Sequence, residues 1–194
     1  ELTKRLDQVV KTKNEILTKV YGANPISLQE TLEKCARWGE KLKSVITSTE
    51  VLLQEALERQ ERVLMEGAQG SLLDLDHGTY PYVTSSSPSV GGGLTGLGFG
   101  PFDIKGVIGV FKAYSTRVGG GPMPTEMKDD KAGMLRERAW EYGTTTGRAR
   151  RIGWFDAIAG RYIRKVNGFT SLVLTRLDVL DGIGPVKICV GYRA

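Results

Sequence analysis

Glycine is distributed unevenly along this chain, and that distribution limits what the chain can fold into. Of its 25 glycines, only Gly22 and Gly39 precede position 67. Glycine weakens helix interiors and favours turns and close backbone approaches. We therefore expect a helical segment over residues 1–60 and an α/β part over residues 61–194.

Apolar residues at helical spacing support the helical assignment. Residues 1–20 carry one such stripe, and the Asn24-Pro25 pair ends it. A second helix is expected to start at Ser27, whose hydroxyl can cap it, with Gly39 as the place for a break. Both stripes are predicted to face a hydrophobic core.

The second part is expected to contain four strands and a helix. The strands are predicted over residues 62–66, 106–114, 171–175 and 186–190, and the helix over residues 154–166. Strands separated by helices and long loops indicate a layered α/β fold with a largely parallel, buried sheet. In such sheets ligands bind beyond the carboxyl ends of the strands.

Charge and cysteine content narrow the function classes. A net charge of +5 permits an anionic ligand without requiring nucleic acid, because most of the excess lies in one arginine-rich region. Cys35 and Cys189 lie far apart and are expected to be reduced, buried residues of a cytoplasmic protein. No apolar run predicts a membrane span or a secretory signal. The chain opens at Glu1 within helical character, so we expect a piece of a longer protein.

The arginine-rich region, residues 144–154, is the most informative stretch. It contains three threonines and three arginines and no carboxylate to neutralise them. Hydroxyls and forked guanidinium groups beside a flexible glycine suit the binding of phosphate or carboxylate oxygens. A solvated basic loop is the alternative, and this stretch alone leaves both open.

Two earlier segments carry further polar candidates. Gln69 lies among small residues after a predicted strand and can address a polar heterocycle, although a plain turn is the favoured alternative. Asp74, Asp76 and His77 are dense enough to bind a cation, but His77 is the only histidine, so a structural role is favoured. Thr84 opens a run of hydroxyls that can bind phosphate or form a turn.

The end of the strand predicted over residues 171–175 gives a sharper signal. Asp178 can accept hydrogen bonds from the ring N–H and the amine of guanine, and Arg176 can stack on the base. The run Leu-Thr-Arg-Leu-Asp is similar to the Asn/Thr-Lys-x-Asp guanine motif of GTP-binding proteins, with arginine in place of lysine. An ordinary acidic turn is the alternative.

Together these segments resemble the adenylosuccinate synthetase family. The matching runs are VLMEGAQGSLLDLDHGTYPYVTSS, GVFKAYSTRVGGGPMPTE, TTTGRARRIGWFDA, LTRLDVLDG and KICVGY, in the family's order. The resemblance implies a P-loop-NTPase-like α/β fold with a layered, mostly parallel central sheet. This chain is expected to hold an incomplete, central part of it, with its helical first third assigned by position only.

The resemblance also implies a role for each matching residue. The residues implied to bind IMP are Gln69, Thr84 and Arg148. The residues implied to bind aspartate are Thr144, Thr145, Thr146, Gly147, Arg148, Ala149 and Arg150. The residues implied to bind GTP are Arg150, Arg176, Leu177 and Asp178.

The implied activity is that of a ligase of purine biosynthesis. It joins IMP and L-aspartate using GTP, by phosphoryl transfer to the IMP 6-oxygen and displacement of that phosphate by the aspartate amine. The catalytic Asp and His and the Mg²⁺ ligands of the family are expected before Glu1, so this chain is expected to hold no catalytic or metal-binding residue. His77 does not match the catalytic His.

Further expectations concern partners and activity. The chain alone is expected to be inactive, and the full protein is expected to be a cytoplasmic homodimer without nucleic-acid or membrane partners. A stand-alone nucleotide- or anion-binding module without catalysis is the alternative function.

Overall fold

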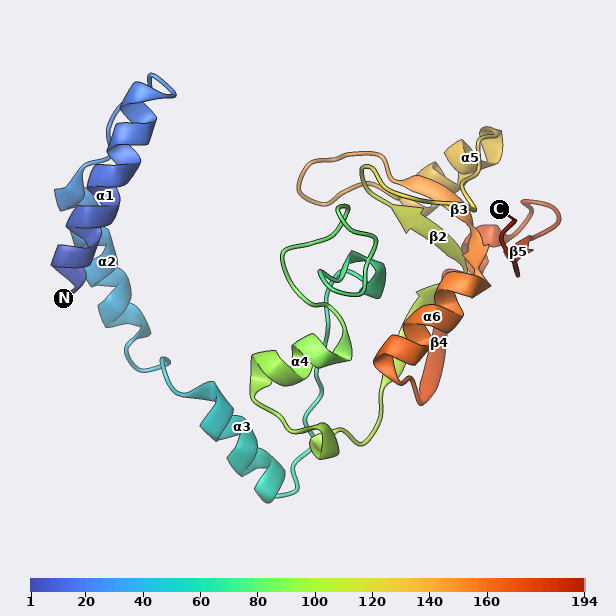
Figure 1. Cartoon of the computed structure of the whole chain (residues 1–194), viewed down its shortest axis with the longest axis horizontal. Coiled ribbons are helices and arrows are strands. Elements are labelled where there is room, and N and C mark those ends of the chain that lie inside the picture. The colour runs from blue at the N-terminus through green and yellow to red at the C-terminus, as the bar shows by residue number, and fades with distance from the viewer. Residues whose placement is uncertain (194) are drawn as a thin grey trace. The chain divides into compact units, whose positions relative to one another are not determined.

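The computed structural model describes residues 1–193, which form two compact units (Figure 1). The first unit is Glu1–Ser48 and the second begins at Thr49. Helices and partly parallel strands occur together in the second unit, so the predicted α/β class is confirmed. The predicted domain boundary near residue 60 stays a prediction.

The first unit contains two helices, α1 (Leu2–Lys19) and α2 (Leu28–Leu42). Ser27 caps α2 as predicted, because its Oγ accepts the N–H of Glu30 at 3.3 Å. The helix passes through Gly39 without a break. Local capping chemistry thus sets the start of α2, whereas one glycine does not end it.

The side chain of Asn14 ties α1 to the connection that leads into α2. Its Oδ1 accepts the N–H of Ile26 at 2.6 Å, and its Nδ2 donates to the Ile26 carbonyl at 2.9 Å. The prediction that the apolar stripes face a core is largely wrong here, since Val45 is 68% and Ile46 is 71% exposed. Two helices alone cannot enclose both stripes.

The second unit contains four α-helices and three short 3-10 helices within the described residues. The α-helices are α3 (Thr49–Glu58), α4 (Val90–Leu97), α5 (Asp130–Ala139) and α6 (Ala157–Asn167). The 3-10 helices are η1 (Ser71–Leu73), η2 (Pro101–Asp103) and η3 (Asp178–Leu180). Across residues 1–193, no helix combines the length and the apolar character needed to cross a bilayer.

The strands of this unit form two small sheets. They are β1 (Ile108–Lys112), β2 (Tyr114–Arg117), β3 (Arg151–Asp156), β4 (Ser171–Thr175) and β5 (Ile188–Cys189). Strands β1 and β4 pair in parallel, β2 and β3 pair antiparallel, and β3 and β5 pair in parallel. The mostly parallel arrangement agrees with the prediction.

Several predicted elements differ from the observed ones. The strand over residues 171–175 is confirmed, whereas the strand over residues 106–114 is divided into β1 and β2, and the last strand is shortened to β5. The helix predicted from residue 154 begins at Ala157 because residues 154–156 pair within β3. Asp156 then caps α6, its Oδ1 accepting two N–H groups at 3.0 Å.

The strand predicted over residues 62–66 does not form. Leu64, at its centre, is 86% exposed. A strand needs a neighbour to take up its backbone N–H and C=O groups, and no segment of residues 1–193 pairs with this one.

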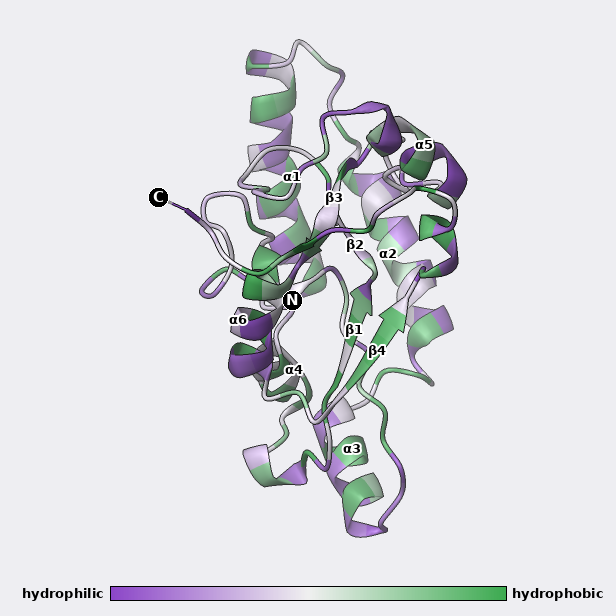
Figure 2. Cartoon of the chain, turned by 90° about the vertical axis from the view of Figure 1, so that its right-hand side faces the viewer, coloured by the Kyte–Doolittle hydropathy of each residue, from purple (hydrophilic) through white to green (hydrophobic). Residues whose placement is uncertain are grey.

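The sheet predicted to be buried is exposed on strands β1 and β4. Val110 is 69%, Leu172 is 62% and Leu174 is 48% exposed, and Figure 2 shows β4 as hydrophobic. The prediction of buried cysteines is also wrong, because Cys35 and Cys189 are free but only partly buried. Parallel strands are buried only when other elements cover both faces, which the described residues do not achieve here.

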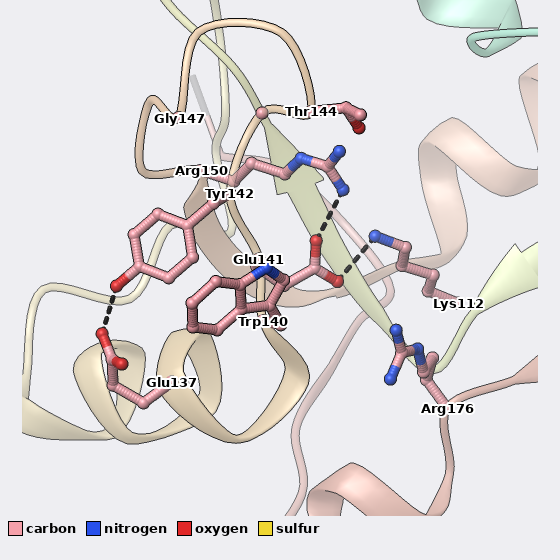
Figure 3. A pocket seen from close by; sticks show the side chains of 10 residues that line it. Lys112, Glu137, Trp140, Glu141, Tyr142, Thr144, Gly147, Arg150 and Arg176 are labelled. Atoms are coloured by element: carbon pink, nitrogen blue, oxygen red, sulfur yellow. Dashed lines mark hydrogen bonds and ion pairs between the residues drawn. The ribbon is translucent and has the colours of Figure 1, made fainter.

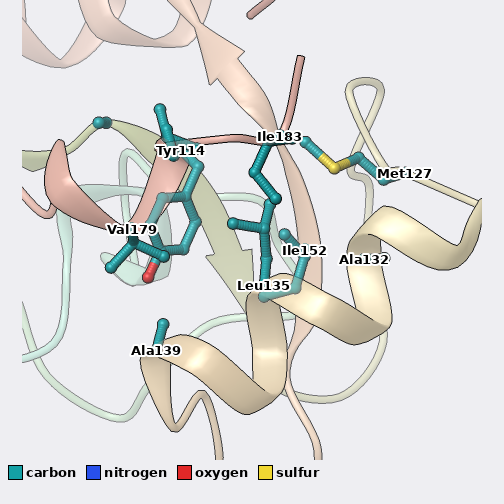
Figure 4. Close-up of a cluster of buried hydrophobic side chains, with 10 residues drawn as sticks. Tyr114, Met127, Ala132, Leu135, Ala139, Ile152, Val179 and Ile183 are labelled. Carbon is teal, nitrogen blue, oxygen red and sulfur yellow. The ribbon is translucent and has the colours of Figure 1, made fainter.

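The hydrophobic core lies where α5 packs on β3 and η3 (Figure 4). Tyr114, Leu135 and Ile152 are each at most 2% exposed. The buried members of this cluster are Ala113, Tyr114, Met127, Ala132, Leu135, Ala139, Ile152, Val179, Leu180 and Ile183. Because Ala139 ends α5, the core fixes the point from which the arginine-rich loop departs.

Candidate functional site

The arginine-rich loop is a hairpin-like excursion between α5 and β3. Trp140 has a left-handed φ of 52° and ends α5. Tyr142 and Ala149 form an isolated antiparallel bridge, and the N–H of Arg150 donates to the Glu141 carbonyl at 2.9 Å. The residues at the tip are exposed, so the predicted aspartate-binding hydroxyls face solvent.

The arginines of this loop differ in what holds them. Arg151 donates from Nε and Nη2 to both oxygens of Glu126, at 2.7 and 2.5 Å. Arg150 donates from Nη1 to Glu141 Oε2 at 2.7 Å. Arg148 is exposed, and its side chain makes no hydrogen bond or ion pair within residues 1–193. The run lacks carboxylates in sequence, but the fold supplies two, which leaves Arg148 as the arginine free to meet an external anion.

Glu141 is a buried carboxylate, only 1% exposed, beneath the loop. Its Oε1 accepts from Lys112 Nζ at 2.6 Å and from the Tyr114 hydroxyl at 2.7 Å, while Oε2 accepts from Arg150. Burial by itself raises the pKa of the Glu141 carboxyl, but these hydrogen bonds hold it below its ordinary value. Burial and the adjacent carboxylate raise the pKa of the Tyr114 hydroxyl, which therefore stays a donor.

A cavity of about 810 Å³ opens beside this carboxylate (Figure 3). Thr144, Gly147 and Arg150 line it from the loop, Lys112 from the end of β1, and Arg176 from the end of β4. This volume falls within the range of small-molecule sites. The carboxyl ends of the parallel pair β1 and β4 thus meet the loop, where α/β sheets place their ligands.

The predicted guanine-binding residues follow β4 directly. Arg176 has a left-handed φ of 63°, which is rare for a residue with a side chain. Arg176, Leu177 and Asp178 are exposed, and the side chains of Arg176 and Asp178 make no hydrogen bond or ion pair within residues 1–193. The following η3 is anchored in the core by Val179 and Leu180. The buried η3 therefore holds this segment in place, while Arg176 and Asp178 expose side chains that have no partner in residues 1–193.

The predicted IMP-binding residues Gln69 and Thr84 are brought together by the fold. Gln69 Nε2 donates to Thr84 Oγ1 at 3.5 Å, and Gln69 adopts a left-handed φ of 63°. The N–H of Thr84 is held by the Leu73 carbonyl at 2.8 Å. Neither residue lines the 810 Å³ cavity, and the third predicted IMP-binding residue, Arg148, does not line it either.

Asp74 has a structural role, as favoured from the sequence. It is 1% exposed, and its carboxylate accepts the N–H groups of Asp76, His77 and Ser89 at 2.9, 3.1 and 3.3 Å. Burial by itself raises the pKa of the Asp74 carboxyl, but the hydrogen bonds lower it by more. The pKa is therefore below its ordinary value. Throughout residues 1–193, no group of three or more His, Cys, Asp or Glu residues is placed to hold a metal ion.

Comparison with known proteins bears directly on these features. A sequence model described as adenylosuccinate synthetase matches residues 1–194. The chain belongs to the adenylosuccinate synthetase family. It is 54% identical over 192 residues to the adenylosuccinate synthetase of Dehalococcoides mccartyi strain 195, covering 99% of this chain and 45% of that protein. It is 49% identical over 192 residues to that of Thermomicrobium roseum, covering 99% and 44%.

Two solved structures share the fold. The fully ligated adenylosuccinate synthetase of Plasmodium falciparum matches with a TM-score of 0.83 and 38% identity, over 93% of this chain and 43% of that one. A cyanophage S-2L succinoaminodeoxyadenylate synthetase, bound to dGMP and to dATP as an energy donor, matches with a TM-score of 0.55 and 28% identity, over 69% of this chain and 43% of that one. This chain therefore spans less than half the length of both proteins.

In this member of the adenylosuccinate synthetase family, sequence reasoning missed the carboxylates that hold the arginines. Glu126 closes the run GVFKAYSTRVGGGPMPTE, and Glu141 precedes the arginine-rich loop. A second signal was Lys112, the charged residue that ends the apolar strand β1. A lone lysine in such a strand indicates a buried counter-charge elsewhere in the chain.

Proposed function

We propose that the protein containing this chain is a GTP-dependent ligase that joins IMP and L-aspartate to give adenylosuccinate, GDP and phosphate. The observation that carries this proposal is the cavity that the predicted aspartate loop and Arg176 line together. Membership of the adenylosuccinate synthetase family supports the same activity. Because the chain spans about 45% of its relatives' length, the activity is proposed for the whole protein.

In this proposal the loop binds the two carboxylates of aspartate. Its exposed hydroxyls and the unpaired guanidinium of Arg148 supply charge-assisted donors. Gly147 has a φ of 62°, so the tip can turn its backbone N–H groups towards an anion. The residues assigned to aspartate are Thr144, Thr145, Thr146, Gly147, Arg148, Ala149 and Arg150.

IMP is assigned to Gln69, Thr84 and Arg148. The hydrogen bond between Gln69 and Thr84 is long, at 3.5 Å, and therefore weak. Both side chains can exchange it at little cost for ligand oxygens, with the Gln69 amide meeting the 6-oxo group and the Thr84 hydroxyl meeting the phosphate. Arg148 adds a cation that pairs with no side chain of residues 1–193.

GTP is assigned to Arg150, Arg176, Leu177 and Asp178. The cyanophage relative is bound to dATP as an energy donor, so a protein of this fold can use a nucleotide in that role. We assign the preference for guanine in this protein to Asp178, whose carboxylate can accept from both N–H groups on the guanine edge.

The chemistry assigned to these residues is binding and charge stabilisation. Arginines that surround transferring phosphoryl oxygens lower the barrier by stabilising charge. We propose that the Mg²⁺ ligands and the catalytic Asp and His belong to other parts of a cytoplasmic, homodimeric protein.

Substitution of Arg148 tests this function. The whole protein is assayed with IMP, aspartate and GTP. Arg148→Leu is expected to raise KM for both IMP and aspartate about tenfold or more, because it removes a charge-assisted contact to each. Arg161→Leu removes an exposed arginine of α6 and is the matched control with unchanged kinetics.

Three outcomes would contradict the proposal. Unchanged KM values for both substrates in Arg148→Leu would remove that residue from the site. Synthesis by residues 1–194 alone would contradict the assignment of catalytic groups elsewhere. Nucleotide binding without turnover by the whole protein would favour the stand-alone binding module.

A further inference from the structure

Glu141 and Arg150 close the base of the arginine-rich loop with two separate contacts. The Arg150 N–H donates to the Glu141 carbonyl at 2.9 Å, and Arg150 Nη1 donates to Glu141 Oε2 at 2.7 Å. Backbone and side chain are therefore joined between the same two residues. Arg150 cannot change its side-chain position far without breaking a charged hydrogen bond at the point where the loop begins and ends.

The other oxygen of Glu141 is anchored to the sheet. Its Oε1 accepts from Lys112 on β1 and from Tyr114 on β2, at 2.6 and 2.7 Å. Lys112 is held further by Thr116 Oγ1 at 3.2 Å. The carboxylate thus links the loop to the two strands beneath it, and the position of Arg150 is set by the sheet as well as by its own flexible stem.

This arrangement leaves Arg150 able to bind an anion. A guanidinium carries five N–H donors, and Glu141 engages Nη1, so Nε and Nη2 stay available for a second carboxylate or phosphate. Arg150 and Glu141 both line the cavity, but Glu141 lies beneath the arginine and is only 1% exposed. Both Glu141 oxygens already accept from Lys112, Tyr114 or Arg150, so the carboxylate acts on a ligand through Arg150.

The charges that line the cavity also indicate that Glu141 fixes Arg150. Lys112, Arg150 and Arg176 all line the cavity, and Glu141 is the carboxylate that pairs with two of them. Removing one partner of a buried pair leaves an uncompensated charge, which is strongly unfavourable. Without the Glu141 charge, Arg150 would be repelled from Lys112 and lose its fixed direction.

We infer that Glu141 is a positioning residue that aims the Arg150 guanidinium at the dicarboxylate substrate and at the nucleotide phosphates. The inference rests on the proposed function and adds to it the residue that orders the loop. Glu141 touches no substrate in this role, so its contribution passes entirely through Arg150.

The substitution Glu141→Gln in the whole protein tests this inference. Glutamine keeps the shape but loses the charge, and its NH₂ group cannot accept from Arg150 or Lys112. KM for aspartate and for GTP is expected to rise about tenfold, as for the loss of a charged hydrogen bond, with KM for IMP changed less than about twofold. Glu126→Gln makes the same chemical change beside Arg151 and is expected to leave all three KM values unchanged.

A double substitution separates positioning from general damage. If Glu141 acts through Arg150, then Glu141→Gln adds no further rise in the aspartate KM once Arg150→Met is present. If the two effects multiply, or if Glu141→Gln leaves the aspartate KM unchanged, the inference is wrong. An unsubstituted protein that makes no adenylosuccinate overturns the proposed function itself, which is a different result.

A second variant covers the case in which Glu141→Gln does not fold. Tyr114→Phe removes one hydroxyl that anchors Glu141 Oε1 and leaves the carboxylate in place. It is expected to raise the aspartate KM in the same direction by a smaller factor, about two- to fivefold for one neutral hydrogen bond. No rise in the aspartate KM of this variant would overturn the inference.

Discussion

At the scale of single residues, counter-charge decides what each arginine of the loop can do. Arg150 and Arg151 are adjacent in sequence, yet Arg151 is held by both oxygens of Glu126, whereas Arg150 keeps donors free towards the cavity. Arg148 is held by no side chain of the described residues. We therefore assign Arg151 a structural role and Arg148 a ligand-binding role. Arg150 has both, because it pairs with Glu141 and keeps donors free for a ligand.

The pair between Glu126 and Arg151 predicts a dependence of stability on pH. The hydrogen bond from Arg151 holds the pKa of the Glu126 carboxyl below its ordinary value of 4.5, although burial opposes this. A carboxyl with a lower pKa in the folded state stabilises the fold above its ordinary pKa. That contribution is lost as the pH falls through the folded-state pKa.

Glu126→Gln is therefore expected to lower the free energy of unfolding by about 1–2 kcal/mol at roughly pH 7. The difference from the unsubstituted protein should shrink as the pH falls below 4.5. Urea unfolding of the whole protein at several pH values measures it. A difference that stayed constant down to about pH 3 would contradict the assignment. Glu40→Gln, on an exposed part of α2, is the control.

At the scale of elements, close backbone packing fixes the strand that leaves the loop. Gly153 lies in β3, is buried, and forms a bridge with Glu126. A Cβ at this position would lie 2.8 Å from both the Thr125 carbonyl oxygen and Met123 Cε. Arg150, which directly precedes this strand, thus depends on a position that only glycine fits.

Gly153→Ala is expected to lower the free energy of unfolding by about 1–3 kcal/mol, because backbone must move to admit the methyl group. Gly133→Ala in α5 is the matched control. A Cβ there meets nothing within 4 Å, so alanine should stabilise the helix by roughly 0.5–1 kcal/mol. Denaturant unfolding measures the change in the free energy of unfolding, which should be negative for Gly153→Ala and positive for Gly133→Ala. Equal changes in the two variants would refute the packing argument.

At the scale of the whole molecule, strands β1 and β4 expose apolar side chains that further residues of the protein are expected to cover. Leu172 and Leu174 on β4 are 62% and 48% exposed, beside Val110 on β1 at 69%. Clustered apolar surface of this kind is uncommon on a soluble protein. The chain spans about 45% of the length of its relatives, which agrees with further residues covering these strands.

Residues 1–194 prepared alone are expected to bind a hydrophobic dye such as anilinonaphthalene sulfonate, whereas the whole protein binds much less. The dye enters exposed apolar surface. Replacing Leu172 and Leu174 with lysine should reduce dye fluorescence from the isolated chain severalfold, since it places two charges on the exposed strand. Equal dye binding by the isolated chain and the whole protein would show that these faces are not covered.

The sequence by itself determined the features that depend on neighbours along the chain. Ser27 caps α2, residues 171–175 form β4, and the α/β class follows from alternating patterns. Its motifs also carried the adenylosuccinate synthetase resemblance that the family match confirms. Helix capping, secondary-structure propensity and motif order depend on residues close together in the chain, so they can be read from the sequence.

The tertiary structure alone decided which groups meet. It left residues 62–66 unpaired although their composition predicts a strand, and it exposed apolar faces that pattern predicts to be buried. It also brought Lys112 and Tyr114 to Glu141, and so gave Arg150 a counter-charge that the arginine-rich run lacks. Pairing, burial and charge neutralisation depend on residues distant in sequence, which only the folded chain places side by side.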